Sequence, residues 1–156
     1  MKKLLIILGT LFLAIILLVA VVIGVAAVKG SALDKESKAY VDRNLPLIIS
    51  TWDEQALWSR ASPEFTQNMK KEDLHSDFVG LSRKFGKMQS YEASEGQSYV
   101  NYSVLSSHNG KVVTAVYITK ITFVGGPAAI KITLIKHGDE WQIEGFNINS
   151  DVLLKH

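Results

Sequence analysis

The fold is decided by residues 111–149, which read KVVTAVYITKITFVGGPAAIKITLIKHGDEWQIEGFNIN. Apolar and polar side chains alternate along this stretch, and β-branched and aromatic residues are frequent, as is typical of β-strands. Turn-forming dipeptides interrupt the alternation at Gly125-Gly126 and Gly138-Asp139. We therefore predict three strands, over residues 111–124, 127–137 and 140–149.

A further strand precedes this stretch. Asn109-Gly110 is a strong two-residue hairpin signal, because both residues tolerate the backbone angles of such turns. It predicts a strand over residues 97–107 that pairs with 111–124, and a short strand near Tyr91 comes before it. Together these segments predict an antiparallel sheet of four to five strands with one buried and one wetter face.

The turns also predict a register. Two-residue turns place Tyr102 opposite Tyr117, Tyr117 opposite Leu134, and Leu134 opposite Ile143. These four residues and Trp141 then share the apolar face of the sheet.

The chain before Gly86 has helical periodicity instead. Apolar residues recur at three- and four-residue steps from Leu33 to Trp52, with Pro46 predicting a kink or a boundary. Thr51-x-x-Glu54 predicts a capping box, and Ser62-Pro63 predicts another helix start. A last helix ends at Gly86, a predicted left-handed cap. The fold class is α+β, with about three helices packed on one face of the curved sheet.

Residues 4–28 contain no charged side chain and are almost entirely apolar. A helix of this length reaches roughly 37 Å, enough to cross a hydrocarbon core of about 30 Å. We predict a transmembrane signal anchor over 1–28, a short linker over 29–33 and a domain over 34–156. The alternative is a cleaved signal peptide, although its apolar region normally spans only about 7–15 residues.

The predicted partner of residues 4–28 is therefore the lipid bilayer of the cell (inner) membrane. Lys29, Lys35, Lys38 and Arg43 follow the span, and a positive-inside count alone would place them in the cytoplasm. However, long trailing domains translocate largely regardless of charge. We predict a domain outside the cytoplasm, in the periplasm or the extracellular space.

Composition excludes several classes of function. The chain has 156 residues and no Cys, which excludes disulfides, thiolate metal sites and thiol nucleophiles. Without Lys2 and Lys3, 15 basic and 15 acidic side chains remain, so the domain is neutral. A neutral domain is not expected to bind nucleic acid.

The stretches WDEQALWSRASPEF (52–65), FGKMQSYE (85–92) and AAIKITLIKHGDEWQIEGFNINS (128–150) are similar to small uncharacterised bacterial exported proteins. The order of elements resembles the cystatin-like α+β superfamily, which includes nuclear transport factor two, ketosteroid isomerase and the small polyketide cyclases. The resemblance implies a cystatin-like fold over roughly residues 33–150, without an assigned activity.

Enzymes of this superfamily place an Asp or a His in a cone between sheet and helices, where an apolar wall shifts its pKa. The predicted inward strand face carries neither. His75 and Asp77 are two apart on a helix and point to different faces. We predict no catalytic residue, no metal site and no cofactor.

The aromatic side chains are the remaining candidates for a site. The predicted pocket lining consists of Trp58, Tyr102, Tyr117, Trp141 and Asn147, which would form an apolar cleft with polar tips. The alternative is that these aromatic residues simply fill the core.

The sequence therefore favours a non-enzymatic, membrane-anchored module that binds a protein partner or a small apolar ligand. An enzyme that uses the cone, isomerase- or hydrolase-like, is the alternative. A scaffold subunit of an envelope assembly is a third possibility.

Overall fold

The computed structural model describes residues 30–103 and 110–154. The predicted span over 4–28 and residue 29 of the predicted linker lie outside these residues, whereas residues 30–33 of that linker form the start of a helix. Within the described ranges, no helix combines the length and apolarity needed to cross a membrane. The chain divides into two compact units, Met1–Leu33 and Asp34–His156, and the second unit contains every strand of the sheet.

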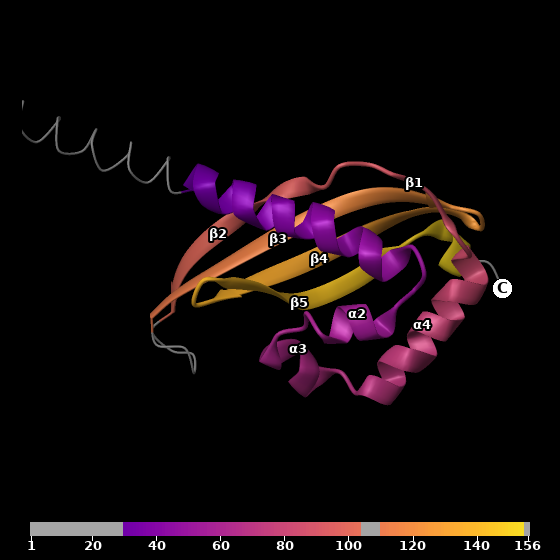
Figure 1. The fold of residues 1–156 in the computed structure, drawn as a ribbon, viewed down its shortest axis with the longest axis horizontal. Helices are drawn as coiled ribbons and strands as arrows, with labels where there is room; N and C mark the ends of the chain where they lie inside the picture. The colour runs from indigo at the N-terminus through magenta and orange to yellow at the C-terminus, as the bar shows by residue number, and fades with distance from the viewer. Residues whose placement is uncertain (1–29, 104–109, 155–156) are drawn as a thin grey trace, which may run out of the picture. The chain divides into compact units, whose positions relative to one another are not determined.

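The fold is α+β, with a curved antiparallel sheet of five strands and four α-helices (Figure 1). A first helix covers residues 30–49. The other elements are α2 (Glu54–Trp58), α3 (Pro63–Asn68), α4 (Lys71–Phe85), β1 (Met88–Tyr91), β2 (Glu95–Ser103), β3 (Gly110–Phe123), β4 (Gly126–His137), β5 (Glu140–Asn149) and the 3-10 helix η1 (Asp151–Leu154). The sheet order is β1-β3-β4-β5, and β2 pairs with β3 further along the same edge as β1.

Two of the predicted helix boundaries are confirmed. Ser62 caps α3 by accepting a hydrogen bond from Phe65 N, and Pro63 occupies the first turn. Gly86 ends α4 with a φ of 66°, which glycine adopts without strain, but its ψ of −144° lies outside the left-handed helical region, so the cap is not the predicted left-handed one. The first helix, however, continues past Pro46 to residue 49.

The predicted capping box at Thr51 is wrong. Asp53 is the cap of α2 and accepts from Ala56 N at 3.0 Å. The cap of α2 lies at Asp53 rather than Thr51 because Trp52 has a φ of 54°, the only positive value on a non-glycine residue in the described part. This turn directs the Trp52 ring into the core.

An aromatic cluster forms the centre of that core. Trp52 stacks on Phe85 and Phe123, with ring centroids 5.8 and 5.1 Å apart, and meets Phe78 edge-on at 6.1 Å. Its Nε1 donates to Gly86 O at 2.8 Å. The cluster thus joins the loop after the first helix, the C-terminal half of α4 and the end of β3.

The predicted β4–β5 register is confirmed, with Leu134 opposite Ile143. The β3–β4 register differs from the prediction by two residues, since Tyr117 lies opposite Ile132 rather than Leu134. The turn consists of Val124 and Gly125 instead of Gly125-Gly126. Because side chains alternate with a period of two, this shift leaves every side chain on its predicted face.

The predicted β2–β3 register is wrong. Gly96, not Tyr102, lies opposite Tyr117, and the ladder ends at the pair Ser103 and Gly110. Gly110 is therefore a strand residue and Asn109-Gly110 is not a two-residue turn. A Cβ on Gly96 would lie 2.8 Å from the Tyr117 ring, so glycine is the residue that admits this ring.

A β-bulge changes the second half of β5. Thr133 pairs with Gly145 while Leu134 pairs with Ile143, so Glu144 is an extra residue. The alternation reverses beyond it. Phe146 therefore lies opposite the buried Ile132.

Two acidic residues of the first helix bind backbone N–H groups, one at the free edge of β2 and one at Ser94, the residue before this strand. Asp34 Oδ1 accepts from Ser98 N at 2.6 Å, and Asp42 Oδ1 accepts from Ser94 N at 3.1 Å. Asp42 also accepts from Tyr91 OH at 3.1 Å. Burial raises the pKa of Asp42, but hydrogen bonds from Lys38, Ser94 and Tyr91 outweigh it and lower the pKa overall.

The free edge of β5 is occupied in a similar way. Ala61 forms a parallel bridge with Ile143. Ser62 N donates to Ile143 O at 2.8 Å, and Ile143 N donates to Arg60 O at 2.8 Å. The segment between α2 and α3 is thus fixed along the edge of the sheet.

Candidate functional site

The structure does not bring the five predicted pocket residues together. Tyr117 is fully buried in the core, where its OH lies 2.9 Å from Ser37 Oγ and donates to Asp34 O at 3.0 Å. It therefore fills space and binds the first helix to β3. The side chain of Tyr102 lies outside the described residues.

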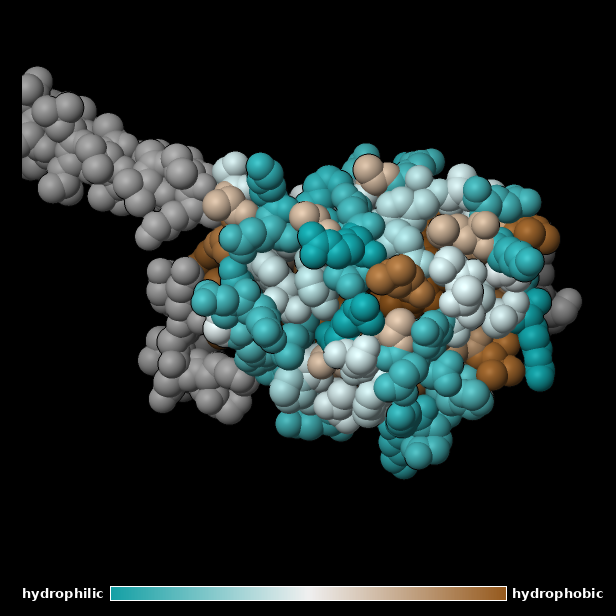
Figure 2. Space-filling model, viewed as in Figure 1, coloured by the Kyte–Doolittle hydropathy of each residue, from teal (hydrophilic) through white to brown (hydrophobic). Residues whose placement is uncertain are grey.

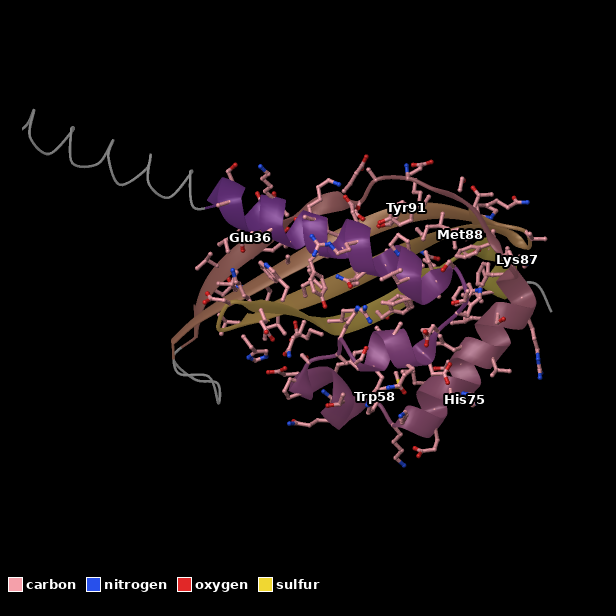
Figure 3. The ribbon with its side chains drawn as sticks, viewed as in Figure 1. Glu36, Trp58, His75, Lys87, Met88 and Tyr91 are labelled. Carbon is pink, nitrogen blue, oxygen red and sulfur yellow. The ribbon has the colours of Figure 1, made fainter. Side chains whose placement is uncertain are left out.

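The other three residues are in different places. Trp141 lines a groove beside the first helix, while Trp58 is half-buried on α2 and lines neither that groove nor a second one beside α4. Figure 3 shows Trp58 well separated from Glu36, which lines the same groove as Trp141. Asn147 was predicted to share a face with Trp141, but the bulge at Glu144 moves it to the opposite face.

The larger of the two grooves, here called the polar groove, has a volume of about 630 Å³. It lies between the first helix, the end of α2 and the β4–β5 turn. Its charged and aromatic lining residues are Glu36, Tyr40, Arg43, Arg60, Asp139, Glu140 and Trp141, and Gln142 also lines it. The residues from the first helix are three and four positions apart and so form one stripe.

Arg60 is held in a fixed position in this groove. Its Nε donates to Asn44 Oδ1 at 2.7 Å, and its Nη1 donates to Ala56 O at 2.8 Å. Asn44 is itself buried and donates to Tyr40 O at 2.8 Å. Burial raises the pKa of Tyr40 despite the nearby positive charge of Arg60.

At the other end of the polar groove, Glu36 pairs with Lys136 at 2.7 Å. The Lys136 hydrogen bond and charge lower the pKa of Glu36. Lys136 Nζ also lies 5.5 Å from the centroid of the Trp141 ring. Trp141 Nε1 is directed toward Glu36 and helps to lower its pKa, yet it reaches no acceptor at hydrogen-bonding geometry.

The second groove, here called the apolar groove, has a volume of about 500 Å³. It opens between α4 and the second half of β5. Apolar side chains from α2, α3, α4 and β5 form most of its wall, among them Leu57, Phe65, Leu74, Phe78, Leu81 and Phe146. Phe78 and Phe146 lie against each other in this wall, with ring centroids 6.0 Å apart.

A few polar residues line the rest of the apolar groove. Ser76, Asp77, Gly80 and Lys84 come from α4, the last three at three- and four-residue steps, and Asn147 comes from β5. Figure 2 shows a mainly hydrophilic face that is broken by separate apolar areas. Asp77 supplies a negative charge, Lys84 a positive charge and Asn147 an amide next to the apolar wall.

Two histidines lie beside carboxylates, and neither lines the polar or the apolar groove. His75 on α4 lies 2.8 Å from Glu54, and His137 on β4 lies 3.1 Å from Glu64 on α3. In the described ranges, no three His, Asp or Glu side chains gather in a way that could hold a metal ion.

Glu144, the bulge residue, is expected to make the stability of the domain depend on pH. Burial, and then the charge of Glu64, raise its pKa above 4.5. Ionisation of Glu144 therefore destabilises the folded domain, and this effect is absent below pH 4.5 and grows as pH rises through the folded pKa. We expect Glu144→Gln to match the unchanged chain in Tm near pH 4 and to exceed it near pH 7. Thermal unfolding followed by circular dichroism across this range tests this, and an equal difference at every pH would contradict it.

Comparisons with protein families, curated proteins and solved structures found no match for this chain. The geometry of the two grooves is therefore the basis for proposing a function. Sequence reasoning missed Arg60 and Glu140, which meet only in the folded chain. It could have found the Glu36, Tyr40 and Arg43 stripe from its helical spacing.

Proposed function

We propose that this chain is a membrane-anchored, non-enzymatic binding module outside the cytoplasm, and that its apolar groove binds a small, mainly apolar ligand. We also propose that the helices pack on one face of the sheet in a cystatin-like arrangement. The uncharged stretch over residues 4–28 supports the anchor.

One observation carries the ligand proposal. The apolar groove combines hydrophobic walls with a few polar groups at its border, which is the usual composition of small-molecule sites. Its volume of about 500 Å³ lies within the range of roughly 300–1,000 Å³ for such sites. Lys84 and Asp77 offer opposite charges to a polar end of the ligand.

Gly80 provides a way to block the groove without removing part of the core. It lies on the stripe of α4 that lines the groove, and a Cβ at this position would meet nothing within 4 Å. Gly80→Leu also improves helix propensity. We therefore expect this variant to fold as well as the unchanged chain while its side chain occupies the groove.

The test uses the full chain in lipid nanodiscs with decanoic acid, decylamine and decanol below their micellar concentrations. We expect at least one compound to raise the Tm of the unchanged chain by mass action, and Gly80→Leu to lose that increase. Ser82→Leu is the matched control, because Ser82 is exposed on α4 and lines neither groove. An increase that survives in Gly80→Leu would place the effect outside the groove, and an increase lost equally in Ser82→Leu would show that the loss is not specific to the groove. Either result would contradict the proposal.

A further inference from the structure

We infer that the polar groove is a second binding site and that it takes a short peptide with free ends, such as a dipeptide. This site does not depend on ligand binding in the apolar groove. The residues that line the polar groove and the apolar groove do not overlap.

The first support is a pair of buried polar atoms. Trp141 Nε1 and Gln142 Oε1 are the two buried side-chain polar atoms without a hydrogen-bond partner in the part of the chain that is described. Both residues line the polar groove, and Trp141 is only 8% exposed. Buried polar groups in native structures normally have partners, so these two atoms are available to pair with a bound molecule. A peptide carbonyl oxygen offers an acceptor to Trp141 Nε1.

The second support is the placement of charge. Arg60 is held by Asn44 and Ala56, and its Nη2 has no partner among the described residues. A guanidinium fixed in this way is suited to a carboxylate, and Arg43 adds a second positive charge to the same groove.

Acidic residues line the same groove near its other wall. Asp139 and Glu140 are exposed in and beside the β4–β5 turn, where they are accessible to an ammonium group. Glu36 is already paired with Lys136 at 2.7 Å. A dipeptide carries a carboxylate, an amide and an ammonium, and so complements all three parts of the groove.

The test is a calorimetric titration of the full chain in lipid nanodiscs with alanyl-alanine, its N-acetyl form and its C-terminal amide. We expect alanyl-alanine to bind and each blocked form to bind at least about tenfold more weakly, because each lacks one charge. Equal binding of the three peptides would overturn the inference, and so would no binding of alanyl-alanine up to about 10 mM.

Variants locate the site. Arg43→Gln is expected to weaken alanyl-alanine about tenfold, and Trp141→Phe about five- to tenfold, since each removes a donor from the groove. Arg83→Gln and Trp58→Phe are the matched controls, because neither residue lines the polar or the apolar groove. Gly80→Leu should leave peptide binding unchanged, and a loss in that variant would show that the two sites are not separate.

Discussion

Replacement of Trp52 with alanine is expected to lower the free energy of unfolding by about 3–5 kcal/mol, the usual cost of truncating a buried Trp. Trp52 is 5% exposed and contacts three other aromatic rings. The variant loses these contacts and leaves a cavity where the first helix, α4 and β3 meet. It also leaves Gly86 O without its donor.

Thermal and urea unfolding of the full chain, followed by circular dichroism, measure this effect. A loss of this size corresponds to a decrease in Tm of about 10–20 °C. Trp58→Ala is the matched control, because Trp58 is half-buried on the adjacent α2 and makes none of these ring contacts. If both variants lost the same stability, the aromatic cluster would not be the centre of the core.

The second large effect is expected from Gly96→Ala, with a loss of about 3 kcal/mol, at the upper end of the range for overpacking. A Cβ at this position would lie 2.0 Å from Val116 O and 2.8 Å from Tyr117 Cα. Because these are backbone atoms of β3, β2 must move away from β3, and the Tyr117 ring, whose Cδ1 also lies 2.8 Å away, must tilt as well. A tilt would break its hydrogen bonds to Ser37 and Asp34.

Chemical denaturation of Gly96→Ala beside Gly80→Ala tests this prediction. Gly80→Ala adds the same methyl group where nothing lies within 4 Å, and helix propensity favours it by up to about 1 kcal/mol. The two substitutions should therefore change stability in opposite directions. A stable Gly96→Ala variant would mean that Tyr117 does not lie against this glycine.

The sequence was sufficient for the fold class and for the positions of most elements. Alternation and turn residues predict β3, β4 and β5 within one or two residues, because a half-buried antiparallel sheet requires that pattern. The Gly138-Asp139 turn predicts the β4–β5 register correctly. Ser62-Pro63 and Gly86 likewise act through local backbone preferences.

Registers that depend on tertiary contacts were not predictable in the same way. The turn before β4 is at Val124 and Gly125 because Gly125 packs on the end of α4, where a Cβ would lie 2.1 Å from Lys84 O. The β2–β3 register depends on the Tyr117 ring over Gly96. Neither contact can be inferred from a hairpin signal alone.

The candidate sites were harder still to predict. Gly145 within a strand indicated a bulge, and recognising it would have placed Phe146 rather than Asn147 toward the core. The polar groove joins Tyr40, Arg60 and Glu140, which are widely separated in sequence. The bridge between Ala61 and Ile143 brings the latter two segments together, and it is a tertiary contact with no sequence signal of its own.

Contacts at both free edges of the sheet affect the solubility of this chain. Asp34 and Asp42 bind the chain at and just before β2, and the segment around Ala61 lies along β5. Exposed strand edges are templates on which a second molecule can add a strand, and this growth leads to fibrils. Here the backbone donors at Ser94, Ser98 and Ile143 are already engaged. At high protein concentration, these edges are therefore less able to add a strand from a second molecule. Because the pKa of Asp42 is lowered, its protection of β2 persists into more acidic surroundings than an ordinary aspartate would allow.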